Sequence, residues 1–291
     1  MRATLAFVAA IFGTMFLAAL LAYPVWLGVH ALVPGWAFHG IVGRFWQLLL
    51  LIGILLAKRR LGLRGRADWG WGLPRPVFLR QAGAGFAIGV ATMLPMTIAM
   101  FAIGILRLRS GFGPAMLLDA IVGGLLTGLA VAIVEETFFR GLMYRAVDRE
   151  SGFVTATWCT AVVYAAIHFF SPARIPADAV ALGSGLQLLG GALEHFSNPL
   201  PVFDSFVTLV LVGLLLALVR RRTGAIAVGL GLHMGWVFVI KATIKLTRVN
   251  EDAPASFLVG GYDGYTGWLV AGWAAALIAV AWSRGWLRPP S

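Results

Sequence analysis

Two neighbouring glutamates and an arginine interrupt an apolar segment near the middle of the chain. They lie in the stretch IVEETFFRG of residues 133–141, and residues 121–134 contain no charged side chain. Each charge near the centre of a membrane helix costs about 2.5–3.5 kcal/mol, so these three need partners, water or a role in chemistry. The alternative is that they mark the cytosolic end of a membrane helix, where charge costs little.

The spacing of the three residues predicts different roles for the two glutamates. Glu136 and Arg140 are four residues apart, so on a helix they share a face and can form a structural ion pair. Glu135 points about 100° away and has no such partner on the helix. Because apolar surroundings favour proton uptake by a carboxylate, Glu135 is suited to act as a general base.

Two histidines lie in other apolar segments. Glu135 precedes Ser151 by 16 residues and His168 follows it by 17. If the chain turns near Ser151, both residues lie about 25 Å from the turn on antiparallel helices and can face each other. Tyr164 is one turn before His168 on the same face. His233 lies in GLGLHMGW at residues 229–236, where small residues allow helices to approach closely.

Composition places these residues in a membrane protein. The chain has 291 residues, of which 60% are hydrophobic and 12% are charged, whereas soluble domains contain about 25% charged residues. We expect an all-α, polytopic bundle of about eight transmembrane helices. The net charge of +11 comes from basic residues in short loops, as the positive-inside rule predicts. The expected partner is therefore the lipid bilayer, and no nucleic acid.

Eight apolar segments have the length or composition of membrane spans. They cover residues 5–29, 41–57, 81–106, 115–147, 153–170, 203–219, 226–240 and 265–282. We divide the chain into N-terminal helices with a basic cytosolic loop at 1–114, a catalytic helix core at 115–241 and a C-terminal helix at 242–291. Placing both termini in the cytosol puts 16 of the 23 basic residues on that side. Trp69 and Trp71 of the basic loop are then expected at the lipid headgroups.

The ordered motifs resemble those of the CAAX-protease and bacteriocin-processing (CPBP) family. These are Glu135-Glu136 followed by Arg140, then Tyr164-x-x-x-His168, then His233 in a later span. The similarity covers residues 115–240. The family consists of intramembrane glutamic endopeptidases of the Ras-converting-enzyme type, so the expected substrate is a membrane-associated peptide or protein.

The resemblance also implies roles for the site residues. Glu135, helped by His168, would activate a water, while Glu136 and Arg140 fix the geometry and His233 stabilises the oxyanion. No cofactor or metal is expected. A zinc site made by Glu135 and the two histidines is the alternative, although the chain lacks a His-Glu-x-x-His motif.

Two positions depart from the family pattern. Tyr164 stands where the family usually has Phe, and Val237 stands where it often has an oxyanion-binding Asn. We expect Trp236, whose indole N–H is a donor, to supply part of what the Asn would supply. Val237 also keeps open a non-proteolytic immunity, scaffold or transporter-like protein with the same fold. The Ala-, Gly- and Arg-rich composition indicates a bacterial cytoplasmic membrane.

Overall fold

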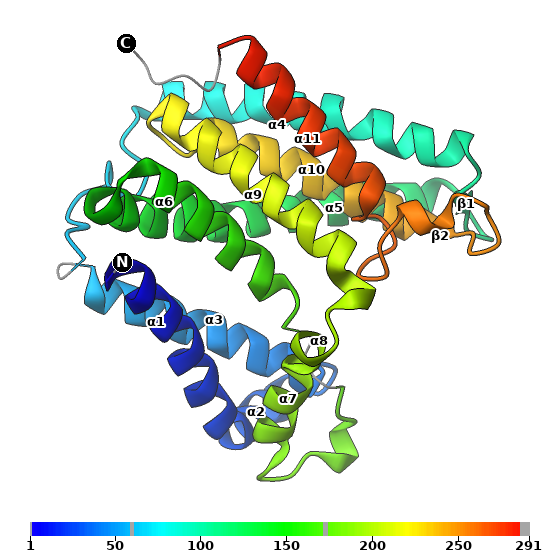
Figure 1. Ribbon diagram of the computed structural model, residues 1–291. Coiled ribbons are helices and arrows are strands. Elements are labelled where there is room, and N and C mark those ends of the chain that lie inside the picture. The colour runs from blue at the N-terminus through cyan, green and yellow to red at the C-terminus, as the bar shows by residue number, and fades with distance from the viewer. Residues whose placement is uncertain (1, 59–60, 171–173, 286–291) are drawn as a thin grey trace. The chain divides into compact units, whose positions relative to one another are not determined.

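The computed structural model describes residues 2–58, 61–170 and 174–285 (Figure 1). Contacts between Cα atoms divide the chain into two compact units. One comprises Met1–Arg64 and Ala166–Leu200, and the other comprises Gly65–Ala165 and Pro201–Ser291. Both units are built almost entirely from helices, which confirms the predicted all-α class. The division at residues 114 and 241 stays a prediction.

Six helices within the described ranges are long and apolar enough to cross a membrane. They are Arg2–Leu20, Phe38–Ala57, Arg75–Ala102, Pro114–His168, Leu200–Thr223 and Ala227–Leu246. The fourth has 55 residues and is broken at Gly152, whose φ of 80° and ψ of 167° are not helical. This break lies next to Ser151, where the hairpin turn was predicted. Counting its two arms separately and adding the shorter apolar helix Trp268–Ser283 gives eight segments, but eight spans stays a prediction.

The first unit contains α1 (Arg2–Leu20), α2 (Ala22–Leu32), α3 (Phe38–Ala57), the 3₁₀ turn η2 (Ala177–Ala179), α7 (Ser184–Ala192) and α8 (Glu194–Ser197). The segment predicted as one span over residues 5–29 is thus two helices. Pro24 explains the break, because its ring clashes with the carbonyl of Leu20, four residues earlier. Trp26, Phe38 and Ile41 contribute to the buried core of this unit.

The second unit contains the long helices of the charged motifs. They are α4 (Arg75–Ala102), α5 (Pro114–Glu135), the π-helix η1 (Glu136–Met143), α6 (Tyr144–His168), α9 (Phe203–Thr223), α10 (Ala227–Leu246) and α11 (Trp268–Ser283). The last residues of α6 belong to the first unit. The 3₁₀ turns η3 (Leu200–Val202) and η4 (Ser256–Leu258) lie in the connections. Strands β1 (Leu106–Leu108) and β2 (Thr247–Val249) form an antiparallel pair, with Leu106 opposite Val249.

Helix α10 packs directly against α4 and α5 through glycines (Figure 1). A Cβ atom on Gly231 would lie 1.9 Å from the carbonyl oxygen of Ala82 in α4, and one on Gly128 of α5 would lie 2.7 Å from that of Met234. Small residues allow such backbone contact in lipid, where dispersion replaces the hydrophobic effect between helices. Similar approaches involve Gly85, Gly89, Gly124 and Gly235. The packing brings His233 of α10 to the end of α5.

Candidate active site

A buried ion pair lies at the beginning of η1. Arg140 Nη1 donates to Glu136 Oε1 at 3.0 Å, and the two side chains are 0% and 1% exposed. Arg140 Nη2 donates to the carbonyl oxygen of Gly213 in α9 at 3.3 Å. Charge-assisted hydrogen bonds of this kind stabilise the ionised carboxylate. The pair therefore ties η1 to α9 through a guanidinium that is fully withdrawn from solvent.

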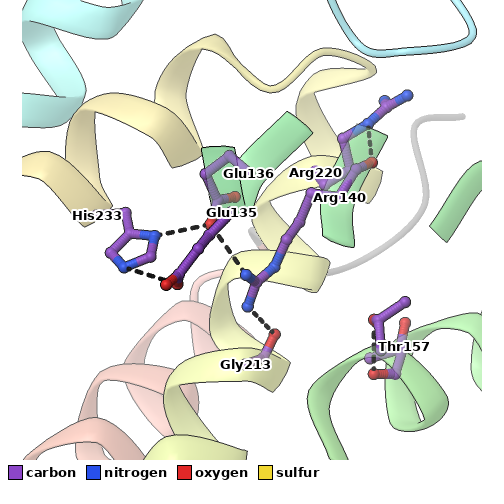
Figure 2. A network of polar contacts seen from close by, with 8 residues as sticks. Glu135, Glu136, Arg140, Thr157, Gly213, Arg220 and His233 are labelled. Carbon is purple, nitrogen blue, oxygen red and sulfur yellow. Dashed lines mark hydrogen bonds and ion pairs between the residues drawn. The ribbon is translucent and has the colours of Figure 1, made fainter. Parts of the chain in front are cut away.

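His233 lies between the two glutamates (Figure 2). Its Nδ1 is 2.9 Å from Glu136 Oε1, and its Nε2 is 3.7 Å from Glu135 Oε2. Because the ionised Glu136 carboxylate can only accept hydrogen bonds, Nδ1 carries the hydrogen in this contact. Nε2 is then the nitrogen that is directed toward Glu135.

The two glutamates differ in their access to water. The Glu135 side chain is 21% exposed, whereas Glu136 is 1% and His233 is 4% exposed. The predicted pair of Glu136 and Arg140 is present, and both carboxylates also approach the imidazole of His233 on another helix. The backbone changes from α-helix to π-helix at Glu136. Insertions of this kind recur at functional sites.

Aromatic rings enclose the ion pair. The Arg140 guanidinium carbon lies 4.5 Å from the centre of the Tyr164 ring, within the range of a cation–π interaction. The Phe139 ring meets Tyr164 edge-on at 5.4 Å. Tyr164 and His233 are also edge-on, with their centres 6.1 Å apart. Tyr164 is buried and therefore supports Arg140 and His233 from α6.

The loop before α4 supports η1 from another side. Trp71 Nε1 donates to Thr137 Oγ1 at 3.1 Å, and the Trp71 ring stacks on Phe78 at 4.7 Å. A Cβ atom on Gly141 would lie 2.4 Å from the carbonyl oxygen of Trp69. The expected place of Trp71 at the lipid headgroups stays a prediction, and the structure adds that its indole binds the residue next to Glu136. Pattern alone does not reveal this, because an anchoring Trp and a packed Trp share the same sequence context.

Arg220 is a second supporting residue that the sequence analysis did not identify. Its Nε donates to the carbonyl oxygen of Arg140 at 3.0 Å, and the residue is only 7% exposed (Figure 2). By sequence alone, the run Arg220-Arg221-Arg222 is typical of cytosolic charge at the end of a span. Its first position is instead part of the network around η1.

Trp236 and His168 were both predicted to take part in the site, and the structure leaves both roles as predictions. Trp236 Nε1 donates to Thr92 Oγ1 at 3.0 Å, so this N–H already has an acceptor on α4. Its contribution to an oxyanion site stays a prediction. His168 is the last residue of α6 and belongs to the first unit, whereas Glu135 and His233 belong to the second. Its partnership with Glu135 likewise stays a prediction.

Tyr262 lies in the loop between η4 and α11, and the charge of Glu135 influences its pKa. Partial burial raises the pKa of Tyr262 to about 12, and the carboxylates of Asp263 and Glu135 act in the same direction. The phenol is therefore neutral at physiological pH and retains its donor hydrogen. Nothing in the local sequence pattern indicated this relation, because Tyr262 follows Glu135 by more than a hundred residues.

The arrangement combines a general base with a fixed imidazole. Glu135 is the carboxylate that water reaches, and Glu136 holds one nitrogen of His233 so that the other is directed toward Glu135. In such an arrangement the carboxylate can take a proton from water, and the imidazole can donate a hydrogen bond to a developing negative charge. Within the described ranges, no group of three or more His, Cys, Asp or Glu residues is arranged to hold a metal ion.

Comparison with known families identifies the helices that carry this site. Residues 117–239 match the family model described as Rce1-like, type II CAAX prenyl endopeptidase. The matched segment begins in α5 and ends in α10, so it includes Glu135, Glu136 and His233. No curated protein and no solved structure matches the chain.

Proposed function

We propose that the protein is an integral membrane hydrolase of peptide bonds in which Glu135 activates the attacking water, because residues 117–239 match the Rce1-like family model. The proposed substrate is a membrane-associated protein or peptide. The observation that carries the assignment is the contrast between the two carboxylates, since Glu135 is 21% and Glu136 is 1% exposed. A general base must reach the proton that it abstracts, directly or through one water.

His233 is proposed to stabilise the oxyanion. A protonated imidazole donates from both nitrogens, and those of His233 lie 2.9 Å from Glu136 Oε1 and 3.7 Å from Glu135 Oε2. With Nδ1 bound to Glu136, Nε2–H is the donor that remains for the substrate. Preorganisation of this donor follows from the buried pair of Glu136 and Arg140, which prevents rotation of the ring.

His168 is proposed to share the proton of the attacking water with Glu135. The support is the break at Gly152, next to the predicted turn from which Glu135 and His168 are almost equally distant along the chain. The mechanism needs no metal ion, because a carboxylate and imidazoles supply both base and donor.

The proposed location is a bacterial cytoplasmic membrane with both termini in the cytosol. The support is the distribution of basic residues, 16 of 23 on one side. In this orientation the chain reaches the cytosol shortly after η1, so Glu135 lies closer to the cytosolic face than to the outer face. Substrates would then be cleaved near the cytosolic end of their membrane segments.

The test uses purified protein in liposomes and a library of membrane-proximal peptides, with cleavage followed by mass spectrometry. Glu135→Gln keeps the shape of the side chain but removes the base, so we expect no product and an unchanged unfolding temperature. The matched control is Glu251→Gln, which removes an exposed carboxylate from a loop outside the site and should cleave normally. Normal turnover in Glu135→Gln would exclude Glu135 as the base.

A further inference from the structure

A polar cavity of about 510 Å³ lies beyond η1 in the second unit. It is formed by the loop before α4, the beginning of α6 and the end of α9. The charged and aromatic residues that line it are Asp68, Tyr144, Arg145, Asp148, Phe153, Arg220 and Arg221. All of them follow or precede membrane spans on the side assigned to the cytosol.

The two carboxylates of the cavity already have basic partners. Asp68 binds Arg149 and lies 3.7 Å from Arg145 Nε. Asp148 lies 3.8 Å from Arg145 Nη1. These ion pairs involve the arginines of α6 and not those of α9.

Arg220 and Arg221 form no ion pair with any carboxylate of the described residues. Arg220 is 7% exposed, and its Nε is occupied by the carbonyl oxygen of Arg140. The Arg221 guanidinium carbon lies 3.3 Å from the centre of the Phe153 ring. Asp68 and Asp148 line the same cavity, but neither is within ion-pair distance of the guanidinium groups of Arg220 and Arg221.

The end of the helix does not balance this charge. A helix C-terminus carries about half a negative charge, which the three consecutive arginines at the end of α9 must share. Three arginines and two aspartates line the cavity, so an anion from outside the chain would balance the remaining positive charge. Guanidinium groups bind phosphate through paired hydrogen bonds, and the cytosolic leaflet is rich in anionic headgroups.

We propose that the cavity binds a phosphate group between Arg220 and Arg221, supplied by a lipid headgroup or by free phosphate. Because Arg220 also holds the carbonyl oxygen of Arg140, the bound phosphate contacts the support of η1. The proposal does not depend on peptidase activity. It rests only on the charges and contacts of the cavity.

Binding is measured on the delipidated full-length protein in an uncharged detergent. Native mass spectrometry counts the phosphatidylglycerol molecules bound to the protein. Diacylglycerol of the same chain length is the control ligand, because it lacks the phosphate. Thermal unfolding is followed in parallel with added inorganic phosphate. Arg221→Gln removes one guanidinium of the site, and Arg222→Gln is the matched control, since it removes the exposed neighbouring charge.

We expect the wild type and Arg222→Gln to retain phosphatidylglycerol but not diacylglycerol. Arg221→Gln should bind at least about tenfold more weakly, the loss expected for one charged hydrogen-bond donor. Stabilisation by inorganic phosphate without lipid retention, lost in Arg221→Gln, would support the site and identify free phosphate as its ligand.

Equal binding by both variants, or equal loss in both, would overturn the proposal, because a general surface charge would then explain it. Arg220→Lys adds a second test that keeps the charge but removes the paired donors. Arg220→Lys should also weaken phosphate binding. If Arg220→Lys does not fold, the result for Arg221→Gln decides the test.

Discussion

Replacing Glu136 with Gln should destabilise the protein strongly, because Glu136 Oε1 joins two buried groups. Arg140 Nη1 is 3.0 Å away and His233 Nδ1 is 2.9 Å away, and none of the three side chains is more than 4% exposed. The amide retains an acceptor oxygen but removes the negative charge. Arg140 is then a buried cation whose remaining contacts are the Gly213 carbonyl and the Tyr164 ring.

Breaking a buried ion pair by removing one partner costs about 3–5 kcal/mol. For a chain of this size, 1 kcal/mol shifts the unfolding temperature by about 2–4 °C, so the expected decrease is about 6–20 °C. Tryptophan fluorescence during thermal unfolding in detergent measures the change. Glu135→Gln is the control, and because Glu135 is partly exposed and 3.7 Å from its partner, it should cost less than about 1 kcal/mol.

The double variant Glu136→Gln with Arg140→Met separates stability from catalysis. Removing the orphaned cation should restore a large part of the unfolding temperature, since apolar replacement of a buried pair is often neutral. Turnover should stay low, because His233 still lacks the acceptor that fixes its ring. The reasoning fails if Glu135→Gln is the less stable single variant, or if the double variant is no more stable than Glu136→Gln.

Three further predictions concern the packing at Gly229, the need for a metal ion and the topology of the chain in the membrane. Gly229→Ala would place a Cβ atom 3.2 Å from Glu136 Oε2, a tight contact that should cost about 1–3 kcal/mol and lower turnover, as unfolding and peptide-cleavage assays can measure. A strong chelator should leave the cleavage rate unchanged, and loss of activity that zinc restores would indicate a metal site instead. Reporter fusions at Arg64, Arg149 and Arg221 should all give cytosolic signals, whereas an external signal at Arg149 would reverse the fourth span.

Several features of the fold were accessible from local sequence because their causes are local. Apolar length predicts membrane helices, since only backbone bonded within its own segment is stable in lipid. The four-residue spacing of Glu136 and Arg140 predicted a pair that the structure contains at 3.0 Å. The turn expected near Ser151 coincides with the break at Gly152. The division of the first span was missed, although Pro24 was a local signal for it.

The contacts that complete the site join residues far apart in the chain. His233 and Glu136 are separated by 97 residues, Arg220 and Arg140 by 80, and Trp71 and Thr137 by 66. Helical periodicity orients a side chain on its own helix but does not determine which neighbour it meets. That choice depends on backbone approach at the glycines of α4, α5 and α10. The residue types therefore indicated the chemistry, whereas helix packing decided that one imidazole lies between both carboxylates.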